Sequence, residues 1–263
     1  MREFVAHDSI VRAIWGNTDL VLLVFAGSAA EFALNRAVDW LFFTNRLPQA
    51  PLDRLFSTAR FAQEIVFADR TTAEQTLRRI NAIHRGVEQA RGARIPEWAF
   101  RDVLYMLIDY SERAYQLLYR PLEAEERREL YDVFRRVGAG LEIPDLPASY
   151  EEWKVDRAAH LERDLVYSEH TARLYEQYRA HLGWWRYDLL LEVQALLAPE
   201  RVRRLLRLEP SPLLELASQV YVLCDLFQLR SVIHWLLLPP QTFEQVKEYE
   251  RATARISNLR CEI

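Results

Sequence analysis

The 263-residue chain has few of the residues that mark disulfide-rich, zinc-binding or turn-rich proteins. Its 2 cysteines, Cys224 and Cys261, form no Cys-x-x-Cys pair, which excludes a disulfide framework and argues against a zinc site. Glycine occurs 7 times and proline 11 times, too rarely for a β-sandwich with its many turns. Low cysteine usage favours a reduced environment, and we expect a cytoplasmic protein.

Long hydrophobic runs and regions of one charge sign are also missing. The longest apolar stretch, 20–30, contains Gly27 and ends at Glu31, so it is too short to span a bilayer and is typical of a buried helix. The N-terminal residues lack the apolar core and cleavage site of a signal peptide. Lys+Arg total 34 and Asp+Glu total 38, and the two kinds are interleaved. We therefore expect no transmembrane segment and no nucleic-acid partner.

Helix-forming residues and helical spacing dominate the chain. Half of it is hydrophobic, which supplies a packed core without disulfides or metals. Apolar periodicity and capping residues predict helices at 53–67, 71–92 and 97–118, and one or two apolar helices over 19–43 with Gly27 as the candidate join. No long stretch alternates with period two. The predicted fold class is therefore all-α, a single multi-helix domain over 1–263 with a linker near 141–149 between its two halves.

His84 is the first chemistry-bearing residue with a specific setting. Leu77, Ile80, His84 and Val87 follow spacings of three, four and three, which place them on one helix face. A histidine there can present Nε2 to a metal or to heme iron while Nδ1 donates a hydrogen bond. One such ligand is what a five-coordinate heme needs. The alternative is a hydrogen-bonded core histidine, which the spacing alone favours.

Arg54 and Thr58 lie four residues apart and share a predicted helix face. A buried arginine needs an anionic partner, and that partner could be a heme propionate, dioxygen or a reduced-oxygen intermediate. A structural carboxylate such as Asp53 or Glu64 is the alternative, and Thr58 could simply bond to the Arg54 carbonyl. From the residues alone, the structural interpretation is again favoured.

The other histidines give weaker signals. His234 lies in an apolar run and rivals His84, whereas His7 and His160 are predicted to be surface residues. The segment 151–160 has too few acid–histidine partners to predict a site. The chain contains no HExxH, GxxxxGK, GxGxxG or GxSxG motif.

Two aromatic clusters, at 40–43 and 184–185, are typical of core residues. The alternative is that they line a channel for an apolar substrate.

The segments PLDRLFST at 51–58, VFAD at 66–69 and IHRGV at 83–87 resemble a known family. This is the oxygenase catalytic-domain family of latex clearing protein, a rubber oxygenase, and the fungal MpaB-type enzymes. The family pattern reads approximately P-x-x-R-L-x-x-T, then F-G, then I-H-x-x-V. The resemblance runs from Asp8 through 141–149 into the helices that follow.

The resemblance implies an all-α fold with a globin-like core around a b-type heme. His84 matches the iron ligand, and Arg54 and Thr58 match residues on the opposite, distal side of the heme. Ser57 stands where the rubber oxygenases carry a lysine, a departure that argues against rubber as the substrate. Asp39 lies near the expected position of the catalytic acid of those enzymes.

The resulting hypothesis is a heme-dependent oxygenase that uses dioxygen on an apolar substrate of the isoprenoid or lipid-like kind. His84 would hold the iron, Arg54 would stabilise developing negative charge, and Thr58 with Ser57 would orient oxygen or water. Asp39 would act as a base. The alternatives are a non-catalytic helical protein that binds heme or lipid, and a structural or interaction protein without a cofactor.

Overall fold

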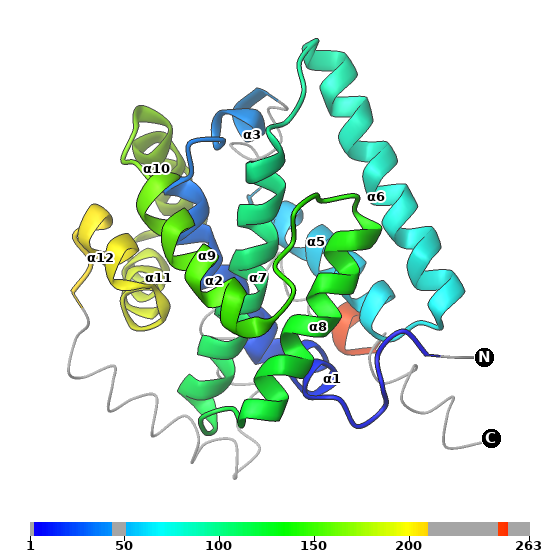
Figure 1. Ribbon diagram of the computed structural model, residues 1–263. Helices are drawn as coiled ribbons and strands as arrows, with labels where there is room; N and C mark the ends of the chain where they lie inside the picture. The colour runs from blue at the N-terminus through cyan, green and yellow to red at the C-terminus, as the bar shows by residue number, and fades with distance from the viewer. Residues whose placement is uncertain (1–2, 44–50, 210–246, 252–263) are drawn as a thin grey trace.

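The computed structural model describes residues 3–43, 51–209 and 247–251 (Figure 1). Within these ranges the chain is helical with no β-strand, and two isolated bridges join Glu3 to Asp69 and Asn35 to Leu165. The all-α prediction is confirmed for this part of the chain. The helices are α1 Ile10–Trp15, α2 Thr18–Leu34, α3 Asp39–Phe43, α5 Pro51–Val66, α6 Arg70–Arg91, α7 Glu97–Leu118, α8 Ala124–Gly140, α9 Tyr150–Arg163, α10 Glu169–Leu182, α11 Trp184–Leu197 and α12 Glu200–Leu206.

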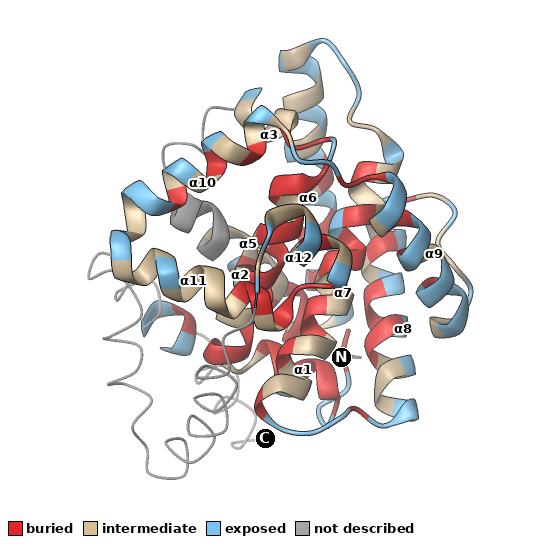
Figure 2. Cartoon of the chain, turned by 90° about the vertical axis from the view of Figure 1, so that its left-hand side faces the viewer, coloured by how far each residue is buried: buried red, intermediate tan, exposed pale blue. Residues whose placement is uncertain are grey.

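Helix α2 is the centre of the fold, and α7 packs along it. Twelve of its 17 residues are buried, as expected for a helix that is apolar on every side (Figure 2). The join predicted at Gly27 is wrong, because α2 continues unbroken to Leu34. Gly27 instead allows close packing, since a Cβ atom there would overlap the ring of Tyr110 on α7.

The remaining helices cover this central pair. Helices α1 and α8 extend the largest hydrophobic cluster, while α10, α11 and α12 cover the other side of α2. The segment 247–251 lies against α1 and α5. Its Tyr249 hydroxyl donates to the Trp15 carbonyl at 2.5 Å, and the Tyr249 carbonyl accepts from Gln63 at 3.0 Å.

The predicted helix boundaries fall close to the observed ones. Helix α7 begins and ends at the predicted residues. Helix α6 ends at Gly92 in the left-handed conformation, as expected, but its N-cap is Asp69, which accepts from Thr72 N at 3.1 Å. Helix α5 begins at Pro51, two residues before the predicted start. The predicted linker at 141–149 is the connection between α8 and α9, and a single domain stays a prediction.

The aromatic clusters at 40–43 and 184–185 are only partly core. Phe43 is 46% exposed and Trp184 is 71% exposed. Spacing could not show this, because their exposure depends on which helices cover them. Within the described ranges, no helix is both long enough and apolar enough to cross a membrane. His234 and both cysteines lie outside the described residues.

Replacement of Gly27 by alanine tests the close contact between α2 and α7. The added methyl group must displace the fully buried Tyr110, so we expect a loss of about 1–3 kcal/mol in the free energy of unfolding. Gly86→Ala is the matched control on the exposed side of α6, where no atom lies within 4 Å, and it should stabilise by up to about 1 kcal/mol. Urea unfolding measures both, and equal effects would contradict the packing argument.

Candidate functional site

Helices α5 and α6 form an antiparallel pair whose register is set by side-chain contacts. Glu64 on α5 pairs with Arg79 on α6 and accepts from the Thr76 hydroxyl at 3.4 Å. The Arg79 guanidinium also lies 4.9 Å from the centre of the Phe61 ring. Earlier residues of α5 therefore lie level with later residues of α6.

Ser57 and Thr58 lie in the earlier half of α5, and His84 lies in the later half of α6. All three side chains are half-buried. The His84 ring centroid lies 5.0 Å from that of Phe100 on α7. The imidazole thus sits beside an aromatic ring on the apolar face predicted from the sequence.

Asp39 lies at the end of this α6 face. Arg91 donates from Nη2 to Asp39 Oδ2 at 2.6 Å, and its guanidinium lies 4.0 Å from the centre of the Trp40 ring. Arg91 follows His84 by seven residues, which is two helical turns or about 10 Å along the axis. The salt bridge therefore holds α3 against the α6 face that carries His84.

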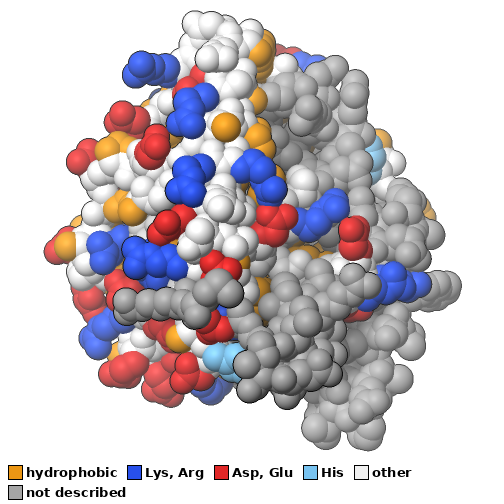
Figure 3. Space-filling model, turned by 90° about the vertical axis from the view of Figure 1, so that its right-hand side faces the viewer, with side chains coloured by type: hydrophobic (Ala, Val, Ile, Leu, Met, Phe, Trp, Pro, Cys, Tyr) orange, Lys and Arg blue, Asp and Glu red, His pale blue; other side chains and the backbone are white. Residues whose placement is uncertain are grey.

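The structure thus places four predicted residues, Asp39, Ser57, Thr58 and His84, on the side of the molecule formed by α3, α5 and α6. The side chain of Arg54 lies outside the described residues. On the face where α6 lies, the right-hand side of Figure 1, basic and acidic side chains are interspersed over the described surface (Figure 3). Surface ion pairs here include Arg70–Glu74 at 2.9 Å and Arg85–Glu142 at 3.6 Å.

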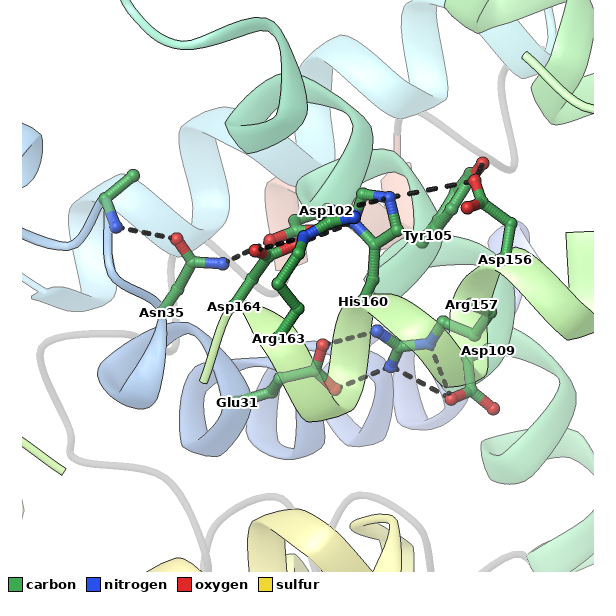
Figure 4. A network of polar contacts seen from close by, with 11 residues as sticks. Glu31, Asn35, Asp102, Tyr105, Asp109, Asp156, Arg157, His160, Arg163 and Asp164 are labelled. Atoms are coloured by element: carbon green, nitrogen blue, oxygen red, sulfur yellow. Dashed lines mark hydrogen bonds and ion pairs between the residues drawn. The ribbon is translucent and has the colours of Figure 1, made fainter. Parts of the chain in front are cut away.

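A second cluster of polar side chains is buried between α2, α7 and α9 (Figure 4). Arg157 of α9 makes a bidentate pair with Glu31 of α2, with N–O distances of 2.5 and 2.6 Å. It also donates to Asp109 of α7 at 3.0 and 3.1 Å. Arg113 donates to the other Asp109 oxygen at 2.7 Å. Two arginines therefore balance two carboxylates in the interior.

The two carboxyl groups respond differently to this setting. Burial raises the pKa of Glu31 above its usual value, against the opposing effect of Arg157. Burial acts in the same direction on Asp109, but Arg157 and Arg113 outweigh it and hold the pKa of Asp109 below its usual value. The two carboxylates hold the pKa of Arg157 well above its usual range. Asp109 is thus the carboxyl group whose ionised form the two arginines favour over burial.

A second polar layer lies one turn along α2 and α9 and two turns along α7. His160 Nδ1 contacts Asp102 of α7, and lies 3.1 Å from Asp164 Oδ2 at the end of α9. Asn35, the C-cap of α2, donates to Asp102 Oδ2 at 2.7 Å. His160 is 2% exposed. Its predicted surface location is therefore wrong, and the segment 151–160, which has too few acid–histidine partners to predict a site, contains a buried histidine whose partners Asp102 and Asp164 lie outside that segment.

The signal that could have located these residues is helical spacing from a large apolar side chain. Trp153, Arg157 and His160 are the buried residues of α9, four and three positions apart. Asp102 and Asp109 are seven positions apart on α7. Asp102, Glu31 and Asp109 lie on other helices, however, so spacing within 151–160 could not reveal these partners of His160 and Arg157.

Replacement of Arg157 by methionine tests the inner layer. The substitution leaves two buried carboxyl groups, those of Glu31 and Asp109, with Arg113 as the one remaining arginine. We therefore expect a loss of about 3–5 kcal/mol in the free energy of unfolding. Arg128→Met is the matched control, because Arg128 is half-exposed and pairs only across the surface, with Glu151 at 3.3 Å. It should cost less than about 1 kcal/mol. Urea unfolding measures both variants. Similar losses of unfolding free energy in the two would show that burial of an ion pair has little influence on its contribution to stability.

The opposite pKa shifts of the two carboxyl groups predict unequal amide substitutions. At pH 7, Asp109→Asn should cost about 3 kcal/mol and more than Glu31→Gln, because only ionised Asp109 is stabilised by folding. A carboxyl group whose pKa is lower in the folded state than in the unfolded state stabilises the fold at pH values above its unfolded pKa. This stabilisation is lost as the pH falls through its folded pKa. The Asp109→Asn penalty should therefore shrink as pH falls below about 4. Urea unfolding at pH 7 and pH 3.5 measures this, and a constant penalty would contradict it.

The chain was compared with known protein families and with curated proteins. A family model described as "ER-bound oxygenase mpaB/B'/Rubber oxygenase, catalytic domain" matches residues 14–235, which span both the α5–α6 pair and the buried polar layers. None of the curated proteins compared with the chain matches it. The matched range covers most of the chain, and the protein belongs to the family of MpaB-type and rubber oxygenase catalytic domains.

Proposed function

We propose that the protein is a heme-dependent oxygenase that uses dioxygen on an apolar substrate, with isoprenoid chains as the first class to test. Membership of an oxygenase family supports the reaction class. The observation that carries the proposal is His84, a half-buried imidazole on an apolar helix face beside Phe100. When bound, a b-type heme supplies the binding and activation of dioxygen.

The residues around His84 fit such a group in donor chemistry. A neutral imidazole is a common axial ligand of heme iron. Ile80 and Val87 lie one turn to either side of His84 on α6, and Phe100 adds an aromatic surface from α7. These apolar neighbours suit a porphyrin face.

The polar residues of the α3–α5–α6 side have separate roles in this proposal. Arg54 supplies a fixed positive charge for dioxygen and its reduced forms. Ser57 and Thr58 supply hydroxyl groups that orient oxygen or a water molecule. Asp39 serves as the base that accepts an allylic proton, and Oδ1 is the atom for this role because Arg91 binds Oδ2.

The absorption spectrum of protein purified from heme-supplied cells tests the ligand assignment. We expect a Soret band in the wild type that is lost in His84→Ala, because the iron then has no protein ligand. His181→Ala is the matched control, since His181 is a half-buried histidine of α10 whose Nδ1 lies 2.8 Å from the Gln177 carbonyl. A band that survives in His84→Ala, or that is absent from the wild type, would exclude His84 as the ligand.

Dioxygen consumption on a panel of isoprenoids then separates an oxygenase from a heme carrier. An oxygenase consumes dioxygen with at least one apolar substrate and loses this activity in Arg54→Met while the Soret band remains. A carrier binds heme with no substrate-dependent consumption. A chain with neither property is a structural or interaction protein.

A further inference from the structure

Three potential metal ligands converge in the second polar layer. None of them belongs to the proposed His84 site. They are Asp102 Oδ1 of α7, His160 Nδ1 of α9 and Asp164 Oδ2 at the C-cap of α9, and all lie within 4.8 Å of one another. The three residues are 2%, 2% and 4% exposed. Buried carboxylates normally have a cation nearby, because removing an ionised group from water is costly.

The charge around this group is unbalanced. In the described part of the chain, Asp102 contacts a neutral amide, from Asn35, and the imidazole of His160. Asp164 pairs with Arg163 at 2.7 and 2.8 Å, but that guanidinium is 57% exposed. If the imidazole is neutral, Asp102, Asp164 and Arg163 together carry one more negative than positive charge. A bound cation would reverse this imbalance.

Two of the three ligands are also held from behind, as metal ligands commonly are. Asn35 holds the second oxygen of Asp102, and Arg163 holds Asp164. The other His160 nitrogen, Nε2, lies 3.7 Å from Asp156 Oδ2. This distance is longer than a hydrogen bond, so the Asp156 carboxylate would have to move closer for Nε2 to donate to it and leave Nδ1 deprotonated for a metal.

The contacts at Asp156 and Arg163 act on this tautomer in opposite directions. Tyr105 donates to Asp156 Oδ2 at 2.6 Å and fixes that carboxylate. Arg163 Nη2 lies 3.1 Å from His160 Nε2, where two donors would face each other once Nε2 carries the proton. The half-exposed Arg163 can turn away from Nε2 while its Nε keeps Asp164.

We propose that Asp102, His160 and Asp164 bind a divalent transition-metal cation of the Zn²⁺ or Mn²⁺ kind. One imidazole nitrogen with carboxylate oxygens suits these ions, whereas Mg²⁺ and Ca²⁺ favour ligands that are all oxygen. The ion would join α7 to the end of α9, beside the bridge between Asn35 and Leu165. This site is independent of the proposed heme and of its ligand.

Metal analysis of the wild-type protein, without a histidine tag, tests the site. Elemental analysis should find about one zinc or manganese per chain, and heme iron is counted separately from the hemochrome spectrum. A chelator should lower the melting temperature by about 5 °C or more, and Zn²⁺ or Mn²⁺, but not Mg²⁺, should restore it. The proposal would be overturned if the wild-type protein contained neither zinc nor manganese and its melting temperature did not change with chelator or with Zn²⁺.

Matched variants distinguish this site from other places on the chain. Asp102→Asn should lose the zinc or manganese and keep the Soret band, whereas His84→Ala should keep the metal whatever happens to heme. Asp132→Asn makes the same chemical change on the exposed side of α8 and should lose neither. Equal metal loss in Asp102→Asn and Asp132→Asn would place the ion elsewhere. If Asp102→Asn fails to fold, the chelator experiment on the wild type decides.

Discussion

The buried ion pair between Arg157 and two carboxylates is the constraint on which the rest of the structure depends. Its members come from α2, α7 and α9, and each would be costly to bury alone. The guanidinium can satisfy Glu31 and Asp109 together only when these three helices are in one arrangement. The hydrophobic effect is non-directional, whereas these charged hydrogen bonds require a specific geometry. The ion pair therefore selects one packing among many that would bury similar area.

The side of the molecule that carries His84 is attached to this central packing by a few specific contacts. Asn81 on α6 donates to the Gly140 carbonyl at the end of α8, at 3.1 Å, and a Cβ atom at Gly140 would meet Leu77. Arg91 holds α3 against the far end of α6. These contacts support both ends of the α6 stretch that contains His84, so its imidazole is positioned by the scaffold rather than by a loop.

The two histidines at issue differ in what surrounds them, and this decides the chemistry proposed for each. His84 has apolar and aromatic neighbours, which suit a large porphyrin that brings its own metal. His160 has the carboxylates of Asp102 and Asp164 at Nδ1, which suit a bare divalent cation. The same side chain type thus serves two kinds of site, because the neighbouring charge and not the imidazole sets the preference.

The sequence by itself determined the helical class, the boundaries of helices such as α7, and the apolar face that carries His84. These depend on capping and spacing, which act between residues a few positions apart. It could not locate His160 correctly, nor the exposure of Trp184, nor the true role of Gly27. Burial depends on which helices cover a residue, and Asp102 meets His160 only after α7 and α9 have packed. Only the tertiary structure could decide these points, because the partners of each residue lie far from it along the chain.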